Sequence, residues 1–210
     1  MSGLIAACSS PSGQVDAADL ADAAQTTADA ALGRDGSGAD AAPVDAADPC
    51  TVPTVRTLFH SSLDDAASIS TPQTGTGPGT LMGGAFVAGH CGSAIELVGA
   101  AGVTFPTLNN GNLNLVTGEL TFFYRPIADG GTLFHRGSGQ DFRASIDSSR
   151  RINWAVYLDG PNYLITAQTD PVNELFDGQW HLLTFAWDFE TGSYLYIGVD
   201  NMLRAESGTA

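Results

Sequence analysis

Lysine is absent from this chain of 210 residues, in which all 8 basic residues are arginines. A Walker-type phosphate loop, a Schiff-base enzyme and a pyridoxal-phosphate site each need a lysine, so these three classes are excluded. Basic charge is also scarce overall, because 23 acidic residues give a net charge of -15. Such an acidic chain repels phosphate backbones, and we expect no nucleic-acid partner.

Long apolar runs are missing as well, since no stretch of about 18 apolar residues could cross a membrane as a helix. Residues 1–49 contain 15 Ala and 8 Asp but no aromatic residue, and every Phe, Tyr and Trp follows from Phe59 onward. Such a segment cannot bury enough surface to offset a backbone ordering cost of about 1–2 kcal/mol per residue. We predict that residues 9–49 form a disordered, self-repelling linker ahead of a folded domain over residues 50–210.

The first eight residues end in Leu-Ile-Ala-Ala-Cys, which resembles the lipobox of bacterial lipoproteins. In that family the cysteine is acylated and becomes the new N-terminus. The resemblance implies that residues 1–8 are part of a lipoprotein signal, that Cys8 carries the lipid, and that the protein is exported to the bacterial outer membrane or cell surface. The basic start and full apolar stretch of a signal peptide are missing, which predicts that translation begins further upstream. The alternative is a chance apolar tetrapeptide before an ordinary cysteine.

The three cysteines fit an exported protein. With Cys8 lipidated, Cys50 and Cys91 remain as an even pair in an oxidising compartment. A disulfide between them would close a loop of about 40 residues and stabilise the fold by roughly 4 kcal/mol. Two reduced thiols are the alternative.

Hydrophobic periodicity from residue 51 onward has a period of two, which is typical of half-buried strands. Turn residues such as Asn-Gly, Asp-Gly and Gly-Gly separate the alternating segments. About nine short strands at this spacing predict an all-β fold, an antiparallel β-sandwich of the jelly-roll type. The predicted strands are residues 57–60, 93–97, 120–125, 132–136, 142–146, 152–158, 163–168, 180–187 and 194–199.

Six motifs in order resemble a laminin-G-like jelly roll of the concanavalin A-like lectin/glucanase superfamily. The strongest is Gly-Gln-Trp-His at residues 178–181, followed by an alternating strand that ends in Trp-Asp. Phe123 stands where this family often has Trp. The family also usually continues with a returning strand after the segment 194–200, so we expect the chain to be incomplete at its C-terminus, with an exposed sheet edge. The motifs cover residues 58–65, 92–97, 118–126, 132–134, 177–188 and 194–200.

Catalytic motifs are not found. Glucanases of this superfamily carry paired carboxylates in an E-x-D-x-x-E run, which is absent here, and Glu119, Glu174 and Glu190 stand alone beside turns. No G-x-S-x-G nucleophile motif occurs. We therefore expect no enzymatic activity and no cofactor.

Calcium is the ion that the resemblance implies, bound by acidic side chains at one rim of the domain. Asp147 and Asp159 lie at predicted strand ends and could serve as ligands, as could Asp64. Turn formation explains these aspartates equally well.

Ligand binding is predicted on sheet faces that carry an aromatic beside a planar polar group. Phe123 with Arg125 and Tyr157 with Asn153 meet this description, although either face could instead be an inner face of the sandwich. Trp154, Trp180 and Trp187 are expected in the core. The predicted function is a non-catalytic binding or adhesion module, lipid-anchored, with a polysaccharide or surface protein as partner. The alternatives are a structural or assembly domain that binds protein, and a glycoside hydrolase-like domain.

Overall fold

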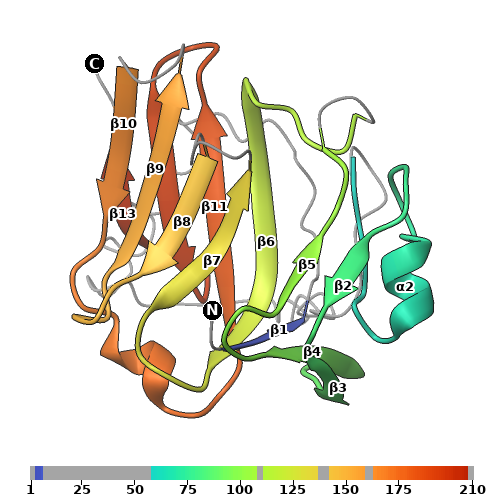
Figure 1. Cartoon of the computed structure of the whole chain (residues 1–210). Coiled ribbons are helices and arrows are strands. Elements are labelled where there is room, and N and C mark those ends of the chain that lie inside the picture. Colours follow the sequence, from blue (N-terminus) through green and yellow to red (C-terminus); the bar gives the residue numbers. More distant parts are fainter. Residues whose placement is uncertain (1–2, 7–57, 108–110, 137–141, 159–162, 208–210) are drawn as a thin grey trace, which may run out of the picture.

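The computed structural model describes residues 3–6, 58–107, 111–136, 142–158 and 163–207, and it shows an all-β protein. Two antiparallel sheets face each other, and a small two-stranded sheet lies beside them (Figure 1). This confirms the predicted antiparallel β-sandwich. In the described part of the chain, no helix has the length and apolar character needed to cross a membrane.

The larger sheet has seven strands in the order β13-β12-β11-β6-β1-β4-β3. Its centre is the long strand β6, which ends at Pro126, a residue that cannot donate to a neighbouring strand. The strands are β1 (Gly3–Ala6), β3 (Ala85–Ala88), β4 (Ser93–Leu97), β6 (Thr117–Pro126), β11 (His181–Asp188), β12 (Tyr194–Val199) and β13 (Met202–Ser207).

The smaller sheet has four strands in the order β10-β9-β8-β7, and it covers one part of the larger sheet (Figure 1). Every pairing within it is antiparallel between consecutive strands. The strands are β7 (Gly131–Arg136), β8 (Phe142–Ile146), β9 (Ile152–Leu158) and β10 (Tyr163–Gln168).

Four short elements complete the described fold. The helix α2 (Ala66–Ser70) begins with a capping box, in which the Asp65 side chain accepts from the Ser68 backbone N–H. The strands β2 (Thr80–Met82) and β5 (Gly102–Thr104) pair with each other, and the 3-10 helix η3 (Asn173–Phe176) precedes β11.

The main core lies between the two sheets and is built from the alternating apolar side chains. Trp154 of β9 is fully buried, and its ring meets Phe185 and Trp187 of β11 edge-on, with centroids 5.4 and 6.1 Å apart. Offset and edge-to-face contacts of this kind add to the hydrophobic gain from burial. The predicted core positions of Trp154 and Trp187 are confirmed. A second cluster, formed by Leu63, Ile69, Ile95 and Leu97, lies around β4 and α2.

The described structure differs from the sequence prediction in several elements, and β2, β3, β5, α2 and η3 were not predicted. The expected strand over residues 57–60 is reduced to a single bridge between His60 and Thr74. Strand β13 was not predicted, because its pairing with β12 shifts register at Ile197 and Gly198 and disturbs the alternation. Strand β1, within the predicted lipoprotein signal, pairs with β4 on one side and with β6 on the other.

Candidate functional site

The two predicted ligand-binding pairs lie on opposite outer faces of the sandwich. Phe123 and Arg125 belong to β6, on the side away from the main core. Phe123 is only 6% exposed and contacts the His90 ring at a centroid distance of 4.0 Å, while the Arg125 guanidinium lies over Trp180 at 5.0 Å. Both side chains are thus engaged inside the protein, which does not favour the sugar-stacking role predicted for them.

Asn153 and Tyr157 lie on the outer face of β9 in the smaller sheet. The Asn153 amide donates to Asp147 Oδ2 at 3.2 Å and also contacts Gln168. Tyr157 is half-buried and pairs with the exposed Leu164 of β10. Because the core separates this face from β6, the two predicted pairs cannot contact one small ligand together.

The predicted metal ligands are engaged in local hydrogen bonds. Asp64 Oδ1 accepts from the Ser93 N–H at 2.8 Å. Asp147 Oδ1 accepts from the backbone N–H groups of Arg151 and Ser149, and the first of these bonds is the main cause of its lowered pKa. Asp159 lies outside the described residues. In the part of the chain that is described, no three His, Cys, Asp or Glu side chains gather as a metal site would require.

The lipid and disulfide predictions depend on residues that the structure does not describe. Cys8 and Cys50 both lie outside the described ranges. Cys91 is half-buried and packs against the small cluster of Ala94 and Phe123. Both predictions therefore stay predictions.

A different set of side chains forms a polar and aromatic surface on the outer face of the larger sheet. Strand pairing aligns Glu119 of β6, Ala186 of β11, Tyr196 of β12 and Glu206 of β13 in one row. Residues directly opposite each other in a sheet project to the same face. The next row brings Tyr194 beside Asp188, and we call these two rows together the tyrosine–carboxylate face.

The composition of the tyrosine–carboxylate face follows from the alternation of its strands. Leu195, Ile197 and Val199 point into the core, so Tyr194 and Tyr196 must face outward. Short residues lie between the large ones, because Ala186 separates Glu119 from Tyr196, and Gly198 follows Tyr196 on the same side. Tyr196 therefore stands beside a region where the backbone is covered only by small groups.

Glu119 is the residue of this face whose electrostatics stand out. Burial raises the pKa of its carboxyl from 4.5 to about 6. Among the residues that the structure describes, none forms a hydrogen bond or ion pair with Glu119. A half-buried carboxylate with a perturbed pKa and no partner is a common sign of a functional position.

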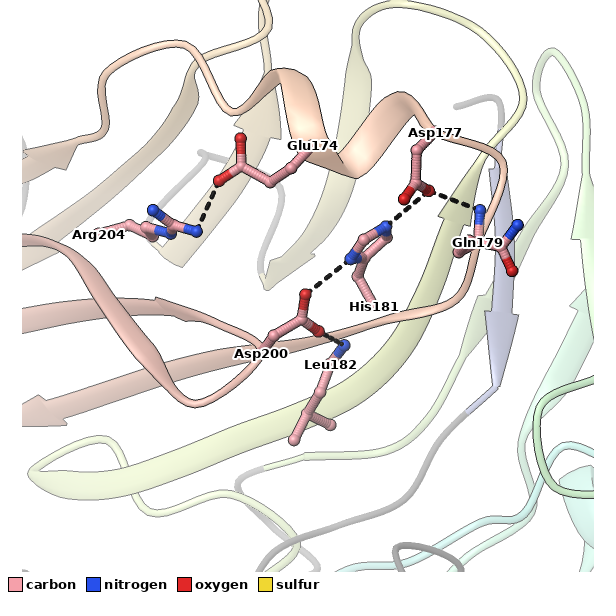
Figure 2. Close-up of polar contacts among 7 residues, drawn as sticks. All are labelled: Glu174, Asp177, Gln179, His181, Leu182, Asp200 and Arg204. Carbon is pink, nitrogen blue, oxygen red and sulfur yellow. Dashed lines mark hydrogen bonds and ion pairs between the residues drawn. The ribbon is translucent and has the colours of Figure 1, made fainter.

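In a second group of polar side chains, His181 at the start of β11 lies between two aspartates (Figure 2). His181 Nδ1 lies 2.7 Å from Asp200 Oδ2, and Nε2 lies 3.0 Å from Asp177 Oδ1. Asp200 also accepts from the Leu182 N–H at 2.9 Å, and Asp177 accepts from the Gln179 N–H at 2.7 Å. These bonds join the end of η3, the start of β11 and the β12–β13 turn, and we call this arrangement the histidine clamp.

The histidine clamp favours a charged imidazole. Burial alone would lower the pKa of His181, but the hydrogen bonds and charges of Asp200 and Asp177 outweigh it, so the pKa is raised from 6.5. A protonated ring donates from both nitrogens and satisfies both carboxylates. With both nitrogens occupied, His181 is poorly placed to take a proton from a hydroxyl nucleophile, and its geometry is that of a structural connection.

The sequence contains partial signals for both the tyrosine–carboxylate face and the histidine clamp. The alternation of residues 194–199 places Tyr194 and Tyr196 on a common face, and Asp177 precedes His181 by four residues. However, joining Glu119 to Tyr196, or Asp200 to His181, requires the strand pairing, which the sequence pattern did not provide.

Comparison with known proteins finds no family model, no curated protein and no solved structure that matches this chain. The geometry and chemistry of the described residues are therefore the basis for inferring the function.

Proposed function

We propose that this protein is a non-catalytic carbohydrate-binding module, displayed on the outer membrane or cell surface by a lipid on Cys8. The observation that carries the proposal is the row of Glu119, Tyr196 and Glu206 on the outer sheet face. Sugars bind through aromatic stacking against their C–H groups and through hydrogen bonds from their hydroxyls to carboxylates and amides. Tyrosines and unpaired carboxylates on one face supply both kinds of contact.

Carboxylate spacing supports a binding role over hydrolysis. Glu119 and Glu206 are three strands apart, which corresponds to roughly 14 Å between their backbones at about 4.8 Å per strand. The paired carboxyl groups of glycosidases are only about 5–9.5 Å apart. Asp188, on the strand next to β6, is a diagonal neighbour of Glu119, but its carboxylate accepts from the Glu190 N–H and the Thr191 N–H and so stabilises its own turn.

A disulfide between Cys50 and Cys91 is part of the same proposal. Cys91 is half-buried and lies just before β4, and Cys50 lies outside the described residues. Such a bond would join the end of the predicted linker to the segment just before β4. The compartment in which disulfides persist is also the one that a lipoprotein enters.

A protein-binding role is the second candidate, and the sheet edge favours it. Strand β13 is the last strand of its sheet, and its residues Met202 and Leu203 are 52% and 50% exposed. Unpaired strand edges with apolar side chains can add a strand from a partner. A stable complex in cross-linking that forms without sugar would select this role.

The carbohydrate proposal is tested by measuring retention on immobilised polysaccharides. We expect the Tyr196→Ala variant to lose at least about fivefold in affinity, because it removes a stacking surface worth more than about 1 kcal/mol. Tyr157→Ala, on the opposite face, is the matched control and should bind like the unmodified protein. Retention that is unchanged in Tyr196→Ala but lost in Tyr157→Ala would move the site to the smaller sheet.

A further inference from the structure

The charge of the tyrosine–carboxylate face indicates the class of sugar that it binds. The two rows carry Glu119, Glu206 and Asp188. None of the described residues in these rows, or in the neighbouring row of Thr121, Thr184 and Gly198, is basic. The chain as a whole has 23 acidic residues, 8 arginines and no lysine, so the face belongs to a protein with a strongly negative net charge.

Basic groups near this sheet already have partners. The Arg125 guanidinium lies over the Trp180 ring at 5.0 Å. Arg204 of β13 forms an ion pair with Glu174 of η3 at 2.6 Å, which is visible in Figure 2. Neither of these described arginines therefore neutralises the tyrosine–carboxylate face.

Glu119 gains the most from a cationic ligand. Its carboxylate is half-buried, so removal from water disfavours its charged form and nothing among the described residues compensates. A neutral sugar hydroxyl could donate one hydrogen bond to it but would leave the charge uncompensated. An ammonium group would supply both the hydrogen bonds and the opposite charge.

Tyr194 and Tyr196 suit the same ligand. Aromatic faces attract cations as well as the C–H groups of a pyranose ring. Burial and the nearby Glu206 raise the pKa of Tyr196, so its phenol stays protonated and can donate to a ligand oxygen. Between β6 and β12 lie two strand spacings, about 9.6 Å, which is room for one sugar ring over Ala186.

We infer that the tyrosine–carboxylate face binds a cationic amino sugar, with the ammonium group beside Glu119 and the ring against Tyr196. This inference rests on the carbohydrate-binding function proposed above. Anionic glycans that carry sulfate, phosphate or uronate groups are disfavoured, because like charges would meet in a half-buried setting. Binding should weaken as salt increases, because part of it is an attraction between opposite charges.

The test compares two ligands that differ only in the amine. Affinities of the full chain for the hexamer of glucosamine and the hexamer of N-acetylglucosamine are measured by titration calorimetry at about pH 6.5. We expect the glucosamine hexamer to bind at least about tenfold more tightly. We also expect Glu119→Gln to remove at least about tenfold of its affinity and to weaken binding of the acetylated hexamer much less, because the latter loses a hydrogen bond but no charge attraction. Glu190→Gln makes the same charge change in the exposed β11–β12 turn and is the control.

The outcomes separate the inference from the proposed function. Equal binding of both hexamers, lost in Tyr196→Ala, would overturn the amino-sugar inference and leave carbohydrate binding in place. Failure of both hexamers and of immobilised polysaccharides to bind would overturn both. Equal losses in Glu119→Gln and Glu190→Gln would show that only net charge matters and would also overturn the inference.

Discussion

At the scale of single residues, we expect Glu119 to lower the free energy of unfolding at neutral pH while it contributes to ligand binding. Its pKa is raised from 4.5 to about 6, so the folded protein disfavours the charged form that exists at neutral pH. This difference in pKa corresponds to a loss of at most about 2 kcal/mol in the free energy of unfolding. Because Glu119 is partly exposed, we expect a loss of about 1 kcal/mol. The penalty is absent below the unfolded pKa and grows as the pH rises toward 6.

We therefore expect Glu119→Gln to increase the free energy of unfolding at about pH 7.5 by about 1 kcal/mol, measured by urea denaturation. At about pH 4 the variant and the unmodified protein should be equally stable, since Glu119 is then neutral in both states. A loss of stability at pH 7.5 would contradict this expectation and would assign Glu119 a structural role. Higher stability with weaker binding is the pattern of a functional residue.

At the scale of elements, the histidine clamp should make the junction of η3, β11 and the β12–β13 turn sensitive to pH. The pKa of His181 is raised above 6.5 in the folded protein, so its ion pairs stabilise fully below about pH 6.5. This stabilisation is lost as the pH rises through the folded pKa. Asp177 has a lowered pKa, so its contribution is present above 3.8 and is lost as the pH falls further.

The variant Asp200→Asn tests the clamp. Asn still tolerates the positive φ of 52° at this position and can still accept from the Leu182 N–H, so mainly the charge is lost. We expect about 1 kcal/mol of destabilisation at about pH 5.5 and a clearly smaller loss at about pH 9. Asp129→Asn, which breaks the exposed pair with Arg150 at 2.9 Å, is the control and should show no such pH dependence. Equal losses for Asp200→Asn at both pH values would mean that titration of His181 does not contribute to the stability of this contact.

At the scale of the whole molecule, the sequence was sufficient to predict the β-sandwich. It was not sufficient to predict which residues lie side by side on the outer surface of the sandwich. The alternation of Ile152, Trp154 and Val156 with polar neighbours predicted both the strand and its buried face, because period-two burial is a local property. Strand order is not local, since β6 pairs with β11, which begins more than fifty residues after it ends. The strand register decides which outward-facing residues become neighbours. The sequence alone therefore could not predict that Glu119 and Tyr196 lie in one row.

The short elements were missed for a related reason. Helix α2 spans only five residues, too few to show a helical period, although Asp65 and Ser68 have the spacing of a capping box. Strand β13 follows a turn in which Asp200 and Asn201 both adopt positive φ, a conformation of tight hairpins that Asp and Asn tolerate but that this pair of residues does not by itself require.

The position of β1 would make cleavage of the proposed lipoprotein signal a structural event. Gly3–Ala6 lies inside the larger sheet, with Ile5 opposite Ile95 and Tyr124, yet signal cleavage before Cys8 would remove it. Removal would leave the facing edges of β4 and β6 without this partner. We expect a chain that starts at Cys8 to exchange the amide hydrogens of β4 and β6 faster than the full chain, with β9 unchanged, by mass spectrometry. Unchanged protection would mean that the two edges close on each other. With faster exchange, the chain with β1 and the chain without it would differ inside a sheet, and the amide exchange of β4 and β6 would report which of the two is present.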